Sequence, residues 1–426
     1  MSIYWPPDLA RIGFTQDEKD RLENLFDRIR SHPAEYILSF NKWEEDLRKV
    51  RTATLYDRAD VTREVESCEV PCSMQIAYNK TGSFETIMLI TKQQLGTGLQ
   101  TRVRYCYDLL SGKELAKKRT DDWYYKQIVQ TLHKESPYPE GVVPMMHLHA
   151  THQKFHFWEL RGAGTLLELL RCPQGVQSVW QRFILIGDLL QGLTWLHTKL
   201  TLPEHTRMMS SGEVRQIPQF SFFHTDLKGQ NILVQKVGDY WRAVIADFGS
   251  TSPIELVSSL GFRPPEVVRV LMARVAKVGS PATMDFKLRY GQKIDIWQMG
   301  LIFSMVLGLG RAVMWRRHPP LACVQNSLAN AQISTTGWQL EVSLANLTQE
   351  QVDEDIAELD QKTEHRYTNL WSLVSKMLRV KPEERPSAAE VLEMFGQSAL
   401  SDAKNAAAAE SGGGEQNPMC QSLQHQ

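Results

Sequence analysis

The stretch "FFHTDLKGQNIL", residues 222–233, decides the fold, because it sets polar side chains between two apolar pairs. Asp226, Lys228 and Asn231 follow Phe222-Phe223 and precede Ile232-Leu233. A carboxylate can take or orient a proton, a lysine can neutralise an anion, and an amide oxygen can bind a metal ion. Three such groups at this spacing indicate a site that carries out chemistry.

Length and composition describe the chain in which this stretch lies. With 426 residues and 42% hydrophobic residues, it is long enough for one large two-lobed domain with extensions or for two ordinary domains. A net charge of -1 gives no reason to expect nucleic acid or an anionic membrane as partner. No apolar run is long enough to cross a bilayer, and the N-terminus "MSIYWPPDLARIGFTQDEKD" lacks the pattern of a signal peptide.

The cysteines and histidines are the candidate metal ligands of this sequence. Six scattered cysteines indicate a reducing compartment, so we expect a cytoplasmic, soluble protein, without distinguishing cytosol from nucleus. Cys68 and Cys72 lack a second ligand pair at finger-like spacing. His147 and His149 share one face of a predicted strand, with no acidic or cysteine ligand nearby in sequence. We interpret these residues as ordinary thiols and as surface or strand histidines.

The order of patterns along the chain predicts an α+β fold with two lobes. Residues 1–82 are expected to form a mainly helical N-terminal extension, with a capping box at Thr15 and Glu18. From residue 83, "SFETIMLITKQQLGTGLQTRVRYCYDLLSGKELAKKRT" predicts three strands joined by Gly-containing turns. A helix ("WYYKQIVQTLHK"), a strand ("FHFWEL") and a long amphipathic helix ("VWQRFILIGDLLQGLTWLHTKL") follow, and the chain is mostly helical after residue 260. The small, polar residues 399–426 are expected to be a disordered tail.

Two features of the strand-rich part could hold the phosphates of a nucleotide. Gly96 and Gly98 in "LGTGLQTRV" would let the backbone approach phosphates, and Val103 would cover an adenine ring. Strand alternation places Ala116 and Lys118 on one face, which selects Lys118 over its neighbour as the phosphate-binding lysine. Taken alone, each feature is more typical of an ordinary turn or of a solvated basic pair.

A second polar stretch, "VIADFGS", follows the first after a short strand-turn-strand. Asp247 is the candidate metal-binding carboxylate, Phe248 a hydrophobic anchor and Gly249 a flexible joint. An aspartate after an apolar strand could simply start a turn, but its occurrence at this distance from Asp226 makes that reading weak.

Seven motifs occur in the order found in eukaryotic-type protein kinases, and the chain resembles that family. They are the Gly-rich loop, Ala-x-Lys, His-x-Asp-Leu-Lys-x-x-Asn, Asp-Phe-Gly, "GFRPPE", "DIWQMG" and the late Arg of "KPEERPS". The resemblance implies a kinase-like domain over 83–398, with an N-lobe at about 83–158, a hinge at 159–161 and a C-lobe at 162–398. It also implies ATP and Mg²⁺ as cofactors and a protein with serine or threonine hydroxyls as substrate.

The resemblance assigns roles to further residues. It implies that Asp226 and Lys228 are catalytic, and that Asn231 and Asp247 bind the metal. Trp158 falls at the gatekeeper position, ahead of hinge residues that bind adenine through their backbone. Those hinge residues include Glu159 and Leu160.

The resemblance implies structural roles for three further residues. Asp295 is expected to accept hydrogen bonds from the loop backbone around His224. Glu266 and Arg385 are expected to form a buried ion pair, and loss of either partner should harm folding.

The match departs from the family pattern at three positions. Thr225 replaces an arginine that pairs with a phosphorylated loop in many family members, so we expect no activation by that route. Tyr125 falls where a helix glutamate usually pairs with the strand lysine, and Thr101 replaces the third glycine of the loop. Extra sequence lies before the catalytic loop, between Glu266 and Asp295, and after "DIWQMG".

Two readings of function follow. The first is an active serine/threonine kinase, because the residues that handle phosphate, metal and hydroxyl are all present and Lys228 is typical of that class. The alternative is a pseudokinase that acts as a scaffold or allosteric partner, because the helix glutamate and the third glycine are missing. A kinase-like enzyme with a small-molecule acceptor fits the later motifs poorly. The sequence does not define an oligomeric state.

Overall fold

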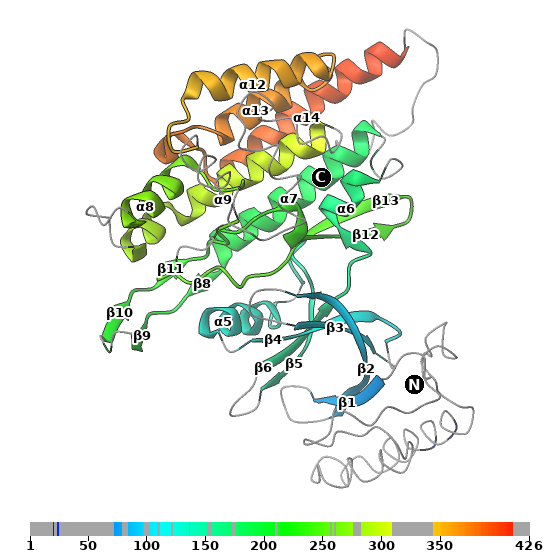
Figure 1. Cartoon of the computed structure of the whole chain (residues 1–426). Coiled ribbons are helices and arrows are strands. Elements are labelled where there is room, and N and C mark those ends of the chain that lie inside the picture. The colour runs from blue at the N-terminus through cyan, green and yellow to red at the C-terminus, as the bar shows by residue number, and fades with distance from the viewer. Residues whose placement is uncertain are drawn as a thin grey trace. The chain divides into compact units, whose positions relative to one another are not determined.

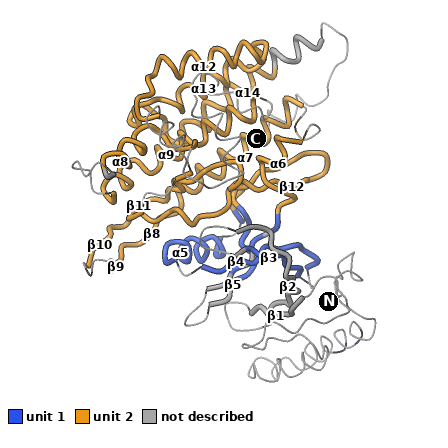
Figure 2. The backbone as a smooth tube through the Cα atoms, in the orientation of Figure 1, with its two compact units in different colours: residues 1–138, 143–161 blue, residues 139–142, 162–426 orange. Residues whose placement is uncertain are grey.

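The computed structural model of the chain divides into two compact units (Figure 2). Unit 1 contains residues 1–138 and 143–161, and unit 2 contains residues 139–142 and 162–426. The residues that the structure describes are 20, 24, 72–78, 84–97, 102–108, 111–120, 122–135, 137–150, 155–172, 176, 178–208, 212, 214–255, 258–259, 261–275, 283–308 and 344–411.

Unit 1, over its described residues, is built on a six-stranded antiparallel sheet in the order β1-β2-β3-β4-β6-β5 (Figure 1). Its strands are β1 (Cys72–Tyr78), β2 (Phe84–Thr97), β3 (Arg102–Asp108), β4 (Glu114–Thr120), β5 (Met145–Ala150) and β6 (Phe155–Leu160). The three strands predicted between residues 83 and 120 are confirmed as β2, β3 and β4, and "FHFWEL" is confirmed as β6.

The helix predicted after β4 is α5 (Trp123–Leu132). Its N-cap is Asp122, whose carboxylate accepts a hydrogen bond from the Tyr125 backbone N–H at 2.8 Å. This bond satisfies one of the free N–H groups of the first turn. An apolar stripe at helical spacing is buried, and it comprises Tyr124, Tyr125, Ile128, Val129 and Leu132.

The pairing of β4 with β6 decides which side chains share a face. Ala116 lies opposite Glu159, and Lys118 lies opposite Phe157. Directly opposed residues project to the same face and alternate residues return to it, so all four side chains lie together. The ring of Tyr125 packs on that of Phe157 with centroids 5.1 Å apart. Helix α5 therefore covers the sheet face that carries Lys118.

Unit 2 is mainly helical, as the sequence predicts after residue 260. Its helices are α6 (Leu166–Arg171), α7 (Val179–Lys199), α8 (Pro265–Val275), α9 (Thr283–Leu307), α12 (Gln349–Lys362), α13 (Thr368–Met377) and α14 (Ala388–Ser411), with 3-10 turns η1 (Gly229–Asn231) and η2 (Pro382–Glu384). Its strands are β7 (Gly164–Thr165), β8 (Thr201–Leu202), β9 (His205–Met208), β10 (Val214–Ile217), β11 (Phe220–Ser221), β12 (Ile232–Val237) and β13 (Tyr240–Ile245). The amphipathic helix predicted before the catalytic loop is confirmed as α7.

Helix α9 forms the interior of unit 2. Every residue from Ile294 to Ser304 is buried, and these include the polar side chains of Asp295, Gln298 and Ser304. Buried polar side chains need hydrogen-bond partners. On a helix that is buried on all sides, a loop that packs on the helix must supply them.

The C-terminal helix corrects the prediction of a disordered tail for residues 399–411, because α14 continues to Ser411, whereas residues 412–426 of the expected tail lie outside the described residues. The segment is rich in alanine, which has the highest helix propensity. It is also tied to the fold: the buried carboxylate of Asp402 accepts hydrogen bonds from the backbone N–H of Leu370 (3.0 Å) and the side chain of Asn369 (2.7 Å). Asp402 thereby caps α13, which has no side-chain cap of its own.

The expected N-terminal extension also differs from the structure at its end. Residues 72–78 form β1, a strand inside the range 1–82 that was expected to be mainly helical. Its pairing with β2 satisfies an edge of the sheet that would otherwise stay open, which local helix propensity cannot reveal. The helix predicted from Thr15 lies almost wholly outside the described residues, of which Asp20 and Asn24 are helical.

Within the described part of the chain, no helix has the length and apolar character needed to cross a membrane.

Candidate active site

The stretch 222–233 forms a loop in unit 2 that runs from β11 through η1 into β12. Its apolar ends anchor it, because Phe222 and Phe223 are buried and Ile232 begins a core strand. The rings of Phe220 and Phe223 stack with centroids 5.2 Å apart. The polar residues between these buried ends are therefore held in a fixed position.

Asp295 of α9 fixes the backbone of this loop from below. Its carboxylate accepts hydrogen bonds from the backbone N–H groups of His224 (2.7 Å) and Thr225 (2.6 Å) and from the ring of His197 (2.8 Å). Thr225 has φ = 59°, a conformation that is uncommon for a β-branched residue and needs support from its surroundings. The contact expected between Asp295 and the loop backbone is thus present.

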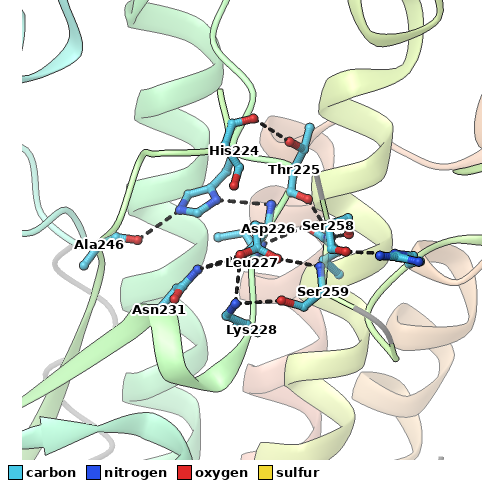
Figure 3. Close-up of polar contacts among 12 residues, drawn as sticks. His224, Thr225, Asp226, Leu227, Lys228, Asn231, Ala246, Ser258 and Ser259 are labelled. Atoms are coloured by element: carbon cyan, nitrogen blue, oxygen red, sulfur yellow. Dashed lines mark hydrogen bonds and ion pairs between the residues drawn. The ribbon is translucent and has the colours of Figure 1, made fainter. Parts of the chain in front are cut away.

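His224 forms hydrogen bonds through both of its ring nitrogens. Its Nε2 donates to the Ala246 carbonyl at 3.0 Å, and its Nδ1 accepts the Asp226 backbone N–H at 3.3 Å (Figure 3). These partners require the tautomer that is protonated on Nε2. The histidine therefore helps to position the backbone of Asp226.

The carboxylate of Asp226 is oriented by three donors. Oδ1 accepts the backbone N–H of Ser259 at 2.7 Å, and Oδ2 accepts the Lys228 ammonium at 2.8 Å and the Asn231 amide at 3.3 Å. Burial by itself raises the pKa of Asp226, but the charge and hydrogen bond of Lys228 and the hydrogen bond of Ser259 outweigh it and lower the pKa below its usual value. Asp226 is accordingly ionised at neutral pH.

Two residues of this network were missed in the sequence. The Ser259 hydroxyl accepts the Lys228 ammonium at 2.6 Å, so Ser259 contacts both catalytic candidates. Gln298 of α9 accepts the Leu227 N–H (2.8 Å) and donates to the Thr225 carbonyl (3.0 Å) and the Ser258 hydroxyl (2.9 Å). Both lie far from residue 226 in sequence, and nothing in their local pattern indicates the contact.

Asp247 opens the stretch that we call the activation segment, residues 247–266. It follows β13, is partly exposed and has φ = 65°. The preceding N–H, of Ala246, donates to the Asn231 carbonyl at 2.9 Å, which ties the two metal-binding candidates together through their backbones. Phe248 is buried and packs on the rings of Phe222 (5.9 Å) and His224 (5.8 Å), so it anchors the start of the segment, and Gly249 follows it in a turn.

The donor set of Asn231 and Asp247 fits Mg²⁺, which prefers oxygen ligands and takes few of them from protein. The Asn231 amide nitrogen donates to Asp226, which directs that nitrogen away from a metal and leaves the amide oxygen as the possible ligand. Among the described residues, no group of three or more His, Cys, Asp or Glu side chains could hold a metal by itself. A metal held by this pair needs further oxygens, such as those of a phosphate chain.

Lys118 lies in unit 1 and forms a buried ion pair there. Its ammonium is 2.6 Å from Oε1 of Glu159, and the two side chains are 9% and 2% exposed. Helix α5 contains no acidic residue, and Tyr125 fills the predicted glutamate position with a buried ring. The acid beside the lysine therefore comes from strand β6.

This pair gives the Glu159 side chain a position that the sequence did not predict, while the expectation that its backbone binds adenine, one residue after a gatekeeper at Trp158, stays a prediction. The strand register places the Glu159 side chain on the sheet face of Ala116 and Lys118. A shift of one residue in a strand exchanges its two faces, and motif spacing does not determine that register. Only the backbone of Trp158 is described.

The remaining nucleotide-binding candidates lie partly inside and partly outside the described residues. Gly96 is opposite Val103 at the end of the β2–β3 hairpin, and Gly98 lies outside the described residues. Ala116 is buried on the lysine face. Leu160 pairs with Leu115 near the start of β4, and its side chain is not described.

The ion pair expected between Glu266 and Arg385 is present in unit 2. The guanidinium donates to both carboxylate oxygens, at 2.6 and 2.8 Å, which is the bidentate geometry that arginine favours. Arg385 is fully buried and also donates to the carbonyls of Arg379 (2.7 Å) and Lys293 (2.9 Å). The pair links the end of the activation segment to α9 and η2.

Comparison with known proteins agrees with this geometry. The sequence profile of the protein kinase domain matches residues 89–395, which is most of the chain. The chain belongs to the protein kinase family, and its fold, a strand-rich unit followed by a helical unit, is the α+β kinase fold.

The relatives are distant. The chain is 24% identical over 232 residues to the meiosis-specific serine/threonine-protein kinase mek1 of Schizosaccharomyces pombe, covering 51% of this chain and 46% of that protein. It is 23% identical over 342 residues to the MAP kinase-interacting serine/threonine-protein kinase 1 of Xenopus tropicalis, covering 74% and 69%. The chain thus spans about half to two thirds of these relatives. Among solved structures it is similar to Rad53 residues 1–466 in complex with AMP-PNP, with 16% identity, a TM-score of 0.44, and coverage of 72% of this chain and 64% of that one.

Proposed function

We propose that the protein is an ATP-dependent kinase that transfers a phosphoryl group to serine or threonine hydroxyls of protein substrates. The observation that carries this proposal is the state of Asp226: an ionised carboxylate, oriented by Lys228, Asn231 and Ser259. A chain that had lost its chemistry would have no need to keep a buried carboxylate charged and aligned.

The unit 2 residues divide the work of the transfer among them. Asp226 orients the acceptor hydroxyl and takes its proton, and Lys228, within 2.8 Å of that carboxylate, places a positive charge next to the phosphoryl group in flight. Magnesium, when held by Asn231 and Asp247 with the nucleotide, supplies neutralisation of the phosphate charge. Ser259 holds Asp226 and Lys228 in place relative to each other through one hydrogen bond to each.

In unit 1, Lys118 is the proposed ligand of the nucleotide phosphates. A lysine needs an acid to hold its charge in a buried place, and Glu159 provides that acid at 2.6 Å. This arrangement answers the absence of an acid in α5, since the strand supplies what the helix lacks. We infer serine and threonine specificity from Lys228 and from the relatives' class.

The test is a transfer assay with purified full-length protein, Mg²⁺, labelled ATP and a generic basic protein as acceptor. Wild type should label the acceptor, and Asp247→Ala and Asp226→Asn should abolish labelling. Acid hydrolysis of the product should release phosphoserine or phosphothreonine, whereas phosphotyrosine alone would contradict the specificity.

A second candidate is a pseudokinase, which one observation favours: within α5 no acidic residue is available to pair with Lys118. In that case wild type and Asp247→Ala would transfer label equally poorly while nucleotide still protected the protein against thermal unfolding. That result would refute the enzyme proposal and support the pseudokinase.

A further inference from the structure

Helix α9 begins at Thr283, well before Asp295, inside extra sequence that the kinase motifs leave unexplained. The early turns of this helix carry Lys287, whose side chain is completely buried. A fully buried lysine is rare unless its charge is compensated. The surroundings of Lys287 therefore indicate what this inserted part of the helix does.

The ammonium of Lys287 binds three backbone carbonyls of the activation segment. It donates to the carbonyls of Ser250 (3.0 Å), Ser252 (2.7 Å) and Glu255 (2.8 Å). An ammonium has three N–H donors, so the three acceptors match its capacity. Its Nζ also lies 5.2 Å from the ring centroid of Phe223, which belongs to the catalytic loop.

Thr225 binds one of these three carbonyls as well. Its hydroxyl donates to the Ser250 carbonyl at 2.9 Å, so this carbonyl is shared between the catalytic loop and α9. Ser259, farther along the same segment, contacts Asp226 and Lys228. The path of the segment at residues 250–255 is thereby coupled to the group that orients the acceptor hydroxyl.

Holding a lysine here costs stability. Burial lowers the pKa of Lys287 to about 7, and the charges of Asp295, Glu255 and Asp226 oppose that shift. Even as a neutral amine with two N–H donors, Lys287 could serve Ser252 and Glu255 while Thr225 serves Ser250. A group retained at such cost, beside a reactive site, is a candidate for function.

We propose that Lys287, with the hydroxyl of Thr225, is a positioning residue that clamps the activation segment by its backbone and so holds Asp226 ready for transfer without phosphorylation. The clamp grips main-chain carbonyls, so it requires no particular side chain or phosphate on the segment. Its catalytic consequence rests on the proposed function, whereas its structural consequence does not.

The structural test is hydrogen–deuterium exchange of wild type, Lys287→Met, Thr225→Val and the double variant at one pH. Exchange in residues 250–259 should rise about tenfold or more in Lys287→Met, as expected for losing a hydrogen bond to a charged group. The double variant should exceed the sum of the two single effects, because each residue is the other's substitute at the Ser250 carbonyl. Arg289→Gln, which removes an exposed cation from the same helix, is the control and should change nothing.

Helix α7 is the internal reference for these measurements. If its amides accelerate as much as those of the segment, or if the segment is unaffected, the proposal is overturned. Thr225→Val retains nearly all packing and keeps the test valid should Lys287→Met fold poorly. Phosphatase treatment of wild type should leave the segment's exchange unchanged, and a rise to the Lys287→Met level would also overturn the proposal.

The kinetic arm asks whether Lys287 acts through the segment. Lys287→Met should lower kcat about tenfold or more while KM for ATP stays within about twofold, because the nucleotide ligands are untouched. The positioning role is contradicted if KM for ATP rises by the same factor as kcat falls. It is also contradicted if wild type is active and Lys287→Met has the same kcat. Should wild type transfer no label at all, the proposed function fails while the exchange data still decide on the clamp.

Discussion

Glu159→Gln tests the pairing of Lys118 with a strand acid. The change removes a charge but keeps the shape and one oxygen acceptor at 2.6 Å from the lysine. Exposed ion pairs are worth about 0.2–1 kcal/mol, whereas breaking a buried pair costs about 3–5 kcal/mol because the remaining charge is left uncompensated. With side chains 9% and 2% exposed, this pair belongs to the buried class.

We expect the lower end of that range, about 3 kcal/mol in the free energy of unfolding, because the amide oxygen of Gln can still accept one hydrogen bond. Separately, we expect kcat/KM for ATP to fall about a hundredfold, which is a loss of about 2.7 kcal/mol of transition-state stabilisation, because the acid that holds Lys118 is lost. Denaturant unfolding and steady-state kinetics with varied ATP measure the two quantities.

Glu114→Gln is the matched control. Glu114 pairs with Arg161 at the same distance, 2.6 Å, in the same sheet, but the two side chains are 50% and 32% exposed. Its loss should change stability by less than about 1 kcal/mol and leave kcat/KM unchanged. If Glu159→Gln behaves like Glu114→Gln in both assays, the ion pair has no role in binding ATP and the reasoning is refuted.

Three further predictions concern unit 2. Ser259→Ala removes the hydroxyl that accepts Lys228 but keeps the N–H that binds Asp226, so kcat should fall about tenfold with little change in melting temperature; an unchanged kcat would count against a role for Ser259. Lys228 keeps the pKa of Asp226 low against burial, so in wild type the carboxylate stays ionised, and its stabilising contribution is lost only as pH falls through that lowered pKa. In Lys228→Met the largest influence opposing burial is lost and only Ser259 and His224 still lower the pKa of Asp226, so the acid limb of the kcat–pH profile should move to higher pH; a profile of unchanged shape would show that Lys228 does not set this pKa. Asp402→Ala should lower the free energy of unfolding by about 1–2 kcal/mol, since α13 loses its cap, and Asp402→Asn should lower it less; equal effects of both would argue against capping.

Much of the fold follows from local sequence. Alternating apolar residues and Gly-containing turns predict β2, β3 and β4, and helical periodicity predicts α5 and α7, because these patterns depend on neighbours a few residues away. The positions of Asp226, Lys228 and Asn231 follow in the same way, because one short loop holds all three.

Other features could not be read locally. Helix α14 extends into the expected tail because Asp402 finds the free N–H groups of α13, and β1 forms because β2 has an edge to pair with. In both cases a stabilising partner belongs to another element, which neighbouring residues do not reveal, although the alanines of α14 by themselves favour a helix.

The sequence by itself determined the family and the α+β fold, and it predicted which residues handle a phosphate, a metal and a hydroxyl. It also determined that α5 lacks an acid at Tyr125 and that Thr225 replaces an arginine. Both depend on residue type and spacing, which can be read directly from the sequence.

Only the tertiary structure decided which side chains lie beside Lys118 and Thr225. The strand register brings the Glu159 carboxylate to Lys118, and the early turns of α9 bring Lys287 to the carbonyls beside Thr225. Both partners are distant in sequence, and both are required because a buried charge or carbonyl is costly until another element supplies its counterpart.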